Sequence, residues 1–161
     1  MNNVSDLITP SEPRRTARVT MLSDGSIWSG PIGTPLEKFF ERAYPELMPS
    51  RTAAAGSATV IAAVVDGALR ELTYPVTSDV SAQPVLLRDS DGLRIYRRSL
   101  SFLLIIAAGE LFPDRKIRID HSLPFGGYYC AVVEGEPFSE AELQRIKERM
   151  WEIVEANEPI T

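Results

Sequence analysis

Three arginines, Arg94, Arg97 and Arg98, lie close together past the middle of this 161-residue chain. If the surrounding residues form a helix, this spacing puts the three guanidinium groups on roughly one face, where they could hold a phosphate or a nucleic-acid backbone. Positive charge near a helix N-terminus is unfavourable for the helix dipole, so carboxylates or a bound anion should compensate for it. Two interpretations stay open: ion pairs with acidic residues such as Asp89 and Asp91, and an anion-binding site.

Few other side chains could support catalysis or bind a metal. His121 is the only histidine and Cys130 the only cysteine, whereas a closed zinc site needs about four nitrogen or sulfur ligands. We therefore expect no metal and no catalytic residue. His121 is expected to lie in a turn and to bond a backbone group or a carboxylate, with a ligand-binding role as the alternative. Cys130 is expected to be a small buried apolar side chain.

The composition restricts the function further. Seventeen basic and 22 acidic residues give a net charge of −5, so any binding of nucleic acid would have to be local. A single cysteine and the absence of a signal-like N-terminus favour the cytoplasm. The uncharged run from Ser99 to Gly109 has 11 residues, fewer than the roughly 20 that cross a bilayer, so we expect no association with a membrane.

The first half of the chain has the pattern of a small sheet crossed by one helix. The dipeptides Asp24-Gly25 and Asp66-Gly67 each predict a β-hairpin, and Thr34, Pro35 and Glu37 together form a helix-start signature. The expected elements are strands 18–22 and 26–28, a helix over 35–42, strands 60–65 and 68–72, and a short strand 85–87, with loops over 45–58 and 77–83. This order, ββαββ and a short last strand, is that of a β-grasp domain.

The second half is expected to begin at a joint, since Ser90-Asp91-Gly92 is a turn cluster. The helix predicted over Ile95–Leu111 is nearly all apolar, so it must be covered on several sides, as a core helix is. Two strands follow it, one over Lys116–Ile119 and one that begins at Gly126-Gly127.

The last helix has a complete start signature. Ser139 and Glu142 are spaced as a capping box, and Phe138 is placed to pack against Leu143. The chain is therefore expected to be an α+β protein.

The second half resembles the domain that follows the N-terminal domain in threonyl-tRNA synthetases, which is related to the editing domain of alanyl-tRNA synthetases. The resemblance is carried by R-S-L-S-F-L-L from Arg98, G-E-L-F-P from Gly109, K-I-R-I-D-H-S-L-P-F-G-G-Y-Y from Lys116, and P-F-S-E-A-E-L-Q-R-I-K-E-R-M-W-E-I from Pro137. The first half resembles the TGS domain, a β-grasp domain that precedes this unit in those synthetases. The resemblance implies a TGS-like domain over 17–90 and an editing-like domain over 91–161, truncated at its C-terminus. The residues before them, 1–16, contain Pro10 and Pro13 and have no apolar period, which predicts a disordered leader.

The synthetase editing site uses two histidines, spaced H-x-x-x-H, on the first helix of that domain. The matching positions here are Arg98 and Phe102. Arginine stays protonated and phenylalanine does not titrate, so neither can act as a general base or a neutral nitrogen ligand. The resemblance therefore implies an editing cleft without editing chemistry. Tyr128 and Tyr129 should point to opposite faces of their strand, so one of them is expected to line this cleft.

The same pair of domains without the histidines resembles the N-terminal region of bacterial proteins in which it is joined to a uridine kinase-like domain. This implies a non-catalytic, regulatory part of an ATP-dependent nucleoside kinase. The chain contains no G-x-x-x-x-G-K-[ST] motif, so ATP and magnesium would belong to a kinase domain outside it.

The partners implied are that kinase domain and a small anionic or nucleotide ligand, bound by Arg94, Arg97, Arg98, His121 and Tyr128. The alternative is an N-terminal tRNA-binding or editing fragment of a threonyl-tRNA synthetase-like protein. A third option is a region that only mediates assembly.

Overall fold

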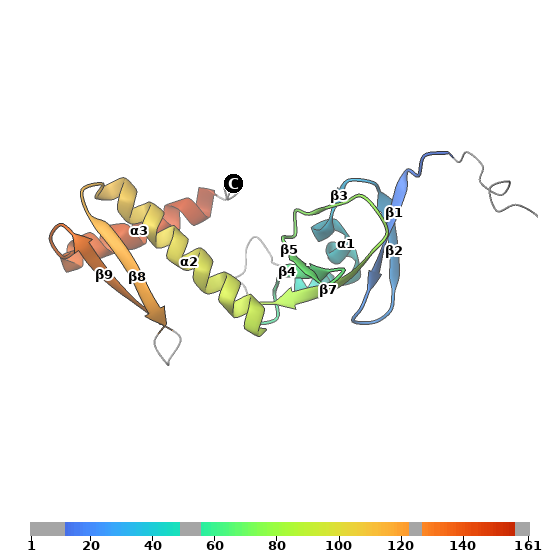
Figure 1. Cartoon of the computed structure of the whole chain (residues 1–161), viewed down its shortest axis with the longest axis horizontal. Helices are drawn as coiled ribbons and strands as arrows, with labels where there is room; N and C mark the ends of the chain where they lie inside the picture. The colour runs from blue at the N-terminus through green and yellow to red at the C-terminus, as the bar shows by residue number, and fades with distance from the viewer. Residues whose placement is uncertain (1–11, 49–55, 123–126, 157–161) are drawn as a thin grey trace, which may run out of the picture. The chain divides into compact units, whose positions relative to one another are not determined.

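The computed structural model describes residues 12–48, 56–122 and 127–156, with backbone only at 121 and 122. The chain divides into two compact units, Met1–Leu93 and Arg94–Thr161, which are described separately below (Figure 1). Helices and strands occur in both units, so the protein is α+β, as the sequence predicts.

The first unit is a mixed sheet of five strands covered by one helix, which is the β-grasp arrangement. The sheet order is β2-β1-β7-β4-β5, and β1 pairs in parallel with the central strand β7 while the other pairs are antiparallel. The strands are β1 (Thr16–Met21), β2 (Ile27–Pro31), β4 (Val60–Val65), β5 (Ala68–Arg70) and β7 (Val80–Leu86). The other elements are the short pair β3 (Thr34–Pro35) and β6 (Pro75–Val76), the helix α1 (Leu36–Ala43) and the 3-10 turn η2 (Pro45–Leu47).

The core of this unit lies between the sheet and α1. Phe40 and Leu36 of α1 are fully buried against Met21 and Val19 of β1 and other apolar side chains of the sheet. The alternation of buried and exposed residues along β1 is the pattern expected of a strand with one face on a core.

The helix-start signature at Thr34 predicted the position of α1 but not its cap. Thr34 and Pro35 pair with β6, and no side chain caps the helix. The amide of Leu36 donates to the Tyr74 carbonyl at 2.9 Å, and the next amide, of Glu37, bonds a carbonyl of the same segment. A neighbouring segment supplies these acceptors, so the capping box that the spacing of Thr34 and Glu37 would form as part of this signature is not present.

The expected loop over 77–83 is also wrong in its second half, because β7 begins at Val80. The strand lies between β1 and β4, and Val80, Ala82 and Val85 are buried. Burial between two neighbours outweighs the polar composition of this segment.

The second unit consists of a hairpin and two helices. Its elements are α2 (Ser90–Leu111), β8 (Lys116–Ser122), β9 (Tyr128–Glu134) and α3 (Glu140–Ala156), and α2 begins within the first unit. Ser90-Asp91-Gly92, which the sequence predicted to be a joint, forms the first turn of α2.

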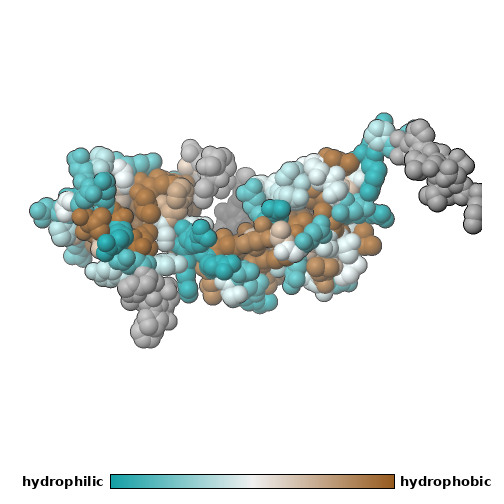
Figure 2. Space-filling view, in the orientation of Figure 1, coloured by the Kyte–Doolittle hydropathy of each residue, from teal (hydrophilic) through white to brown (hydrophobic). Residues whose placement is uncertain are grey.

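The core of the second unit is small. Ala107 and Ala108 of α2 are buried with Ile146 of α3, and the half-buried side chains around them include Leu104 and Leu111. The opposite side of α2 stays exposed, with Phe102 and Ile105 each 47% accessible. The expectation that α2 is covered on several sides is therefore wrong for the part of the chain that the structure describes. Figure 2 shows hydrophobic surface on this unit on the face in view.

Among the described residues, no helix combines the length and apolarity that a membrane span requires.

The start of α3 has the predicted capping box. The Ser139 amide and hydroxyl each donate to the Glu142 carboxylate at 2.8 Å, and the Glu142 amide donates back to the hydroxyl. Phe138 packs on Phe112, with ring centroids 5.2 Å apart, and Leu143 is 52% exposed, so the packing of Phe138 on Leu143 stays a prediction.

Candidate functional site

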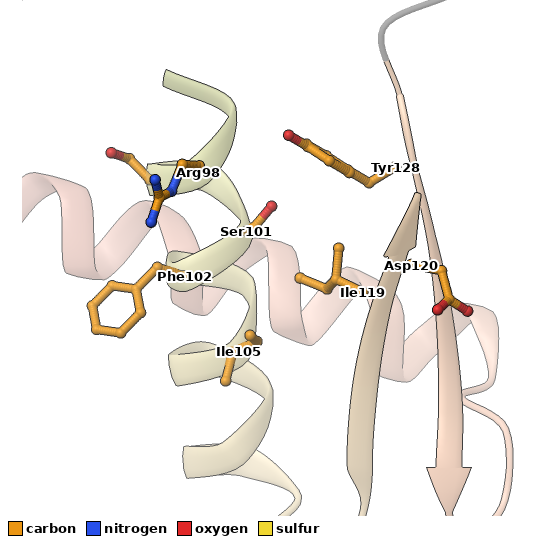
Figure 3. Close-up of a pocket in the computed structure, with 8 residues that line it drawn as sticks. Arg98, Ser101, Phe102, Ile105, Ile119, Asp120 and Tyr128 are labelled. Atoms are coloured by element: carbon orange, nitrogen blue, oxygen red, sulfur yellow. The ribbon is translucent and has the colours of Figure 1, made fainter. Parts of the chain in front are cut away.

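A pocket of about 550 Å³ lies in the second unit, between α2 and the β8–β9 hairpin (Figure 3). Its lining side chains come from three elements: Arg98, Ser99, Ser101, Phe102 and Ile105 from α2, Ile119 and Asp120 from β8, and Tyr128 from β9. The volume is within the range of roughly 300–1,000 Å³ that is usual for small-molecule sites.

Helical spacing brings the α2 residues together. Arg98, Ser101, Phe102 and Ile105 are at positions i, i+3, i+4 and i+7, which share one side of a helix. The neighbouring row, which includes Ala108, packs on the core, so this side is left to border the pocket.

An irregularity in the hairpin supplies the other wall. The pairing of β8 and β9 shifts register between Ile119, which is opposite Cys130, and Ser122, which is opposite Tyr128. Consecutive residues of a regular strand point to opposite faces, and a bulge breaks that rule. Both Ile119 and Asp120, which lie next to this shift, are in the pocket lining.

The pocket has an inner wall and a rim that differ in chemistry. In Figure 3, Ser101, Ile119 and Tyr128 face one another across the space between α2 and the hairpin. Arg98 and Phe102, one turn apart on α2, point away from the hairpin in Figure 3, and both are exposed. The inner wall is therefore mainly apolar, and the rim carries the guanidinium.

The charges around the pocket are not balanced. The Asp120 carboxylate pairs with Arg118 at 3.1 Å and, in Figure 3, points away from α2. Arg98 makes no ion pair with any residue that the structure describes. The pocket therefore has one uncompensated positive charge at its rim and no free negative charge facing it.

Among the side chains that the structure describes, none is a base bonded to a hydroxyl group of the pocket. The Ser101 hydroxyl donates to the Arg97 carbonyl at 3.0 Å rather than to an imidazole or a carboxylate. A serine needs an adjacent base to become a nucleophile, so this geometry supports hydrogen bonding rather than nucleophilic attack.

The structure brings together three of the residues that the sequence singled out, namely Arg98, Phe102 and Tyr128. The other two arginines, Arg94 and Arg97, do not line the pocket. Tyr129 is 53% exposed and is also absent from the lining, so Tyr128 is the tyrosine that faces the pocket.

His121 and Cys130 do not lie where the sequence predicted. The backbone of His121 belongs to β8 rather than to a turn, and its side chain lies outside the described residues. Cys130 is exposed rather than buried, and partial desolvation raises the pKa of its thiol, which keeps it protonated at neutral pH. Within the described ranges no three His, Cys, Asp or Glu side chains are grouped to hold a metal ion.

Sequence reasoning missed Ser99, Ser101, Ile105, Ile119 and Asp120. The helical spacing from Arg98 was a sufficient signal for Ser101 and Ile105. No sequence signal marked Asp120, which lies next to the register shift in the hairpin.

No family model matches the chain. It is 33% identical over 138 residues to the threonine–tRNA ligase of Desulforamulus reducens, a match that covers 86% of this chain and 20% of that protein. It is 34% identical over 100 residues to the threonine–tRNA ligase of Rhodospirillum rubrum and 38% identical over 98 residues to that of Streptomyces griseus, with 62% and 61% of this chain and 15% of each relative covered.

The chain thus spans a fifth or less of the length of these curated relatives. The comparisons give no support to the association with a nucleoside kinase. The homologues of this chain are threonyl-tRNA synthetases.

Proposed function

We propose that the chain is a synthetase-type binding region whose second unit keeps an editing-type pocket but hydrolyses no ester. The observation that carries the proposal is the lining of the pocket, which includes Arg98 and Phe102, the two residues that the resemblance matches to the H-x-x-x-H pair. The similarity to threonine–tRNA ligases supports a role connected with tRNA, and it favours this interpretation over a kinase accessory region.

The chemistry of the pocket supports binding rather than cleavage. Hydrolysis of an aminoacyl ester needs a base that accepts a proton from water or from a nucleophile. An arginine side chain is already protonated near neutral pH and so cannot accept a proton, and a phenylalanine such as Phe102 has no titratable group. Asp120 is an acceptor, but its carboxylate is engaged by Arg118.

A deacylation assay tests the proposal. The purified chain is mixed with threonine tRNA mischarged with serine, and the loss of the ester is followed against a protein-free control. We expect the same rate in both. Hydrolysis above the control, lost on Ser101→Ala or His121→Ala, would refute the proposal, since it would require a working nucleophile or base in the pocket.

Binding of tRNA is the second part of the test. We expect uncharged tRNA to bind weakly and to be released by salt, because the net charge of the chain is −5 and positive side chains are only locally grouped. No retardation of tRNA at low ionic strength would count against a role connected with tRNA.

The resemblance to a region of nucleoside kinases supports a second candidate, because that region also lacks the histidine pair. In this case the chain would be an accessory part of a cytoplasmic kinase that uses ATP and magnesium elsewhere. Continuation of the native reading frame into a phosphate-binding loop would favour this candidate, and continuation into a synthetase core would refute it.

A further inference from the structure

We propose that the pocket between α2 and the β8–β9 hairpin binds a nucleoside monophosphate, with the phosphate on Arg98 and the base against Tyr128 and Ile119. This inference rests on the proposed function in one respect, because both require that the pocket binds a ligand and does not hydrolyse it. It names a free small molecule as the ligand.

The rim of the pocket selects an anion. Arg98 is the only cationic side chain in the lining and has no ion pair within the described residues. A guanidinium matches the oxygens of a phosphate through two parallel hydrogen bonds. Because a single guanidinium is present, a monophosphate is balanced better than a triphosphate, whose further charges would find no partner in the lining.

The acidic lining residue does not oppose this anion. Arg118 binds the Asp120 carboxylate. One oxygen, Oδ2, lies 3.2 Å from Nε and 3.1 Å from a terminal nitrogen of the guanidinium. In Figure 3 it lies on the side of the hairpin away from Arg98. The phosphate is therefore expected at the α2 end of the pocket.

The inner wall suits a flat ring. Tyr128 is half-buried and faces α2, and Ile105 and Ile119 provide apolar surface on the two sides of the pocket. A base stacked on an aromatic side chain gains roughly 1–3 kcal/mol without regard to its identity. We therefore expect little discrimination between purine and pyrimidine monophosphates.

Hydroxyl groups of the lining fit a sugar. Ser101 borders the space between α2 and the hairpin, and the Tyr128 phenol has no hydrogen bond to the described residues. Each hydroxyl can donate to or accept from a ribose hydroxyl. The lining therefore offers a partner for each of the three parts of a nucleotide, whereas an inorganic anion or a nucleoside would leave one end of the pocket unused.

The experiment is a calorimetric titration of the full chain with AMP and UMP, with adenosine, uridine and inorganic phosphate as partial ligands. We expect each monophosphate to bind at least about tenfold more tightly than its nucleoside or phosphate, because a charge-assisted hydrogen bond is worth that factor or more. Equal affinity for nucleoside and nucleotide would overturn the assignment of the phosphate, and no binding of either monophosphate at about 5 mM would overturn the inference as a whole.

Two pairs of variants locate the site. Arg98→Ala should weaken monophosphate binding at least about tenfold, whereas Lys147→Ala, which removes an exposed charge on α3, should change it by less than about twofold. Tyr128→Ala should weaken binding, whereas Tyr129→Ala, on the other face of β9, should not. If the two variants of either pair lost the same affinity for the monophosphate, the assignment of the ligand to this pocket would be refuted. Circular dichroism of each variant verifies that α2 and α3 remain folded.

A binding experiment with a short RNA that carries no amino acid distinguishes this inference from the proposed function. If the RNA binds and free monophosphates do not, the small-ligand site is refuted and the role connected with tRNA stands. If monophosphates bind through Arg98 and mischarged tRNA is also hydrolysed, the ligand assignment stands and the non-hydrolytic function is refuted.

Discussion

Two glycines of α2 should respond to alanine substitution with opposite signs. Gly92, in the first turn, is buried, and a Cβ atom there would overlap the carbonyl oxygen of Leu86, at the end of β7. Gly109, near the last turn, has no atom within 4 Å of the same position. Neither glycine has a positive φ, so backbone strain does not contribute to the difference.

The size of the effect at Gly92 follows from what the Cβ atom would meet. The obstacle is backbone, which cannot rotate aside as a side chain can, and the Leu86 carbonyl also accepts the Asp89 amide at 3.0 Å. Forcing an extra methyl group into a packed site costs about 1–3 kcal/mol, and we expect Gly92→Ala to be near the upper end. For a unit of this size each kcal/mol lowers the melting temperature by about 4–8 °C.

Gly109→Ala is the matched control. Alanine loses less conformational freedom than glycine when a helix forms, and the exposed site offers no clash. The free energy of unfolding should therefore rise by about 0.5–1 kcal/mol. Both substitutions add one methyl group to the same helix.

Urea unfolding followed by tryptophan fluorescence measures the loss of stability in Gly92→Ala. Trp28 packs against the core of the first unit and its indole donates to the Ser26 hydroxyl at 3.0 Å, so its emission should report that unit. Trp151, which is 60% exposed on α3, is replaced by phenylalanine in all samples to remove its signal. Because the two units need not unfold together, far-UV circular dichroism is recorded in parallel.

The result that would refute the reasoning is a Trp28 unfolding midpoint that Gly92→Ala leaves unchanged or raises. The close approach of the first turn of α2 to the end of β7 would then be absent in solution. A loss of stability in Gly109→Ala would show instead that glycine is needed along α2 for a reason other than packing.

Two further predictions concern the charged and polar contacts. Ser139→Ala removes the hydroxyl that donates to the Glu142 carboxylate and accepts from the Glu142 amide at the start of α3. It should lower the stability of the second unit by about 1 kcal/mol, measured by thermal melting, while Ser139→Asp should keep most of that stability. The Arg14 side chain and then the Arg18 amide lower the pKa of Asp79 to about 2. Because this folded-state pKa lies below the ordinary value of 3.8, the stabilisation is present above pH 3.8 and is lost as the pH falls towards about 2. The urea midpoint followed by Trp28 fluorescence should therefore fall less steeply with decreasing pH in Asp79→Asn than in the original chain. The same fall in both would contradict the prediction.

Local signals predicted most of the elements. The glycine turns at Asp24-Gly25 and Asp66-Gly67 lie between paired strands, as expected, since a turn is decided by a few adjacent residues. The capping box at Ser139 is correct for the same reason. The one at Thr34 failed because the acceptors for the first amides of α1 come from residues 72 and 74, which are distant in the sequence.

Burial was harder to predict than element type. The apolar composition of α2 indicated a helix, and the helix exists, but the described residues cover only one side of it. Composition shows how much apolar surface a helix has and not what is available to cover it. The polar start of β7 is the opposite case, since pairing on both sides makes a strand of a segment whose composition favours a loop.

The pocket was predictable in part. The alignment of Arg98 and Phe102 on one side of α2 follows from helical spacing alone, and period-two alternation separates Tyr128 from Tyr129. Ile119 and Asp120 lie next to a register shift in the hairpin, and a shift of register is set by the packing of both strands. The sequence predicted, through the resemblance, that arginine and phenylalanine replace a histidine pair, whereas the separation of an apolar inner wall from a charged rim required coordinates.

Because the two cores differ in size, the two units should differ in how readily they unfold locally. Among the described residues, 13 buried side chains form the core cluster of the first unit and three form that of the second. Backbone amides become accessible to solvent deuterium through openings whose free energy depends on the apolar contacts that are broken. Protection from exchange should therefore be greatest in β1, β4 and β7 and fade early in the hairpin that borders the pocket, so a ligand seated there would be detected first as slowed exchange in β8 and β9.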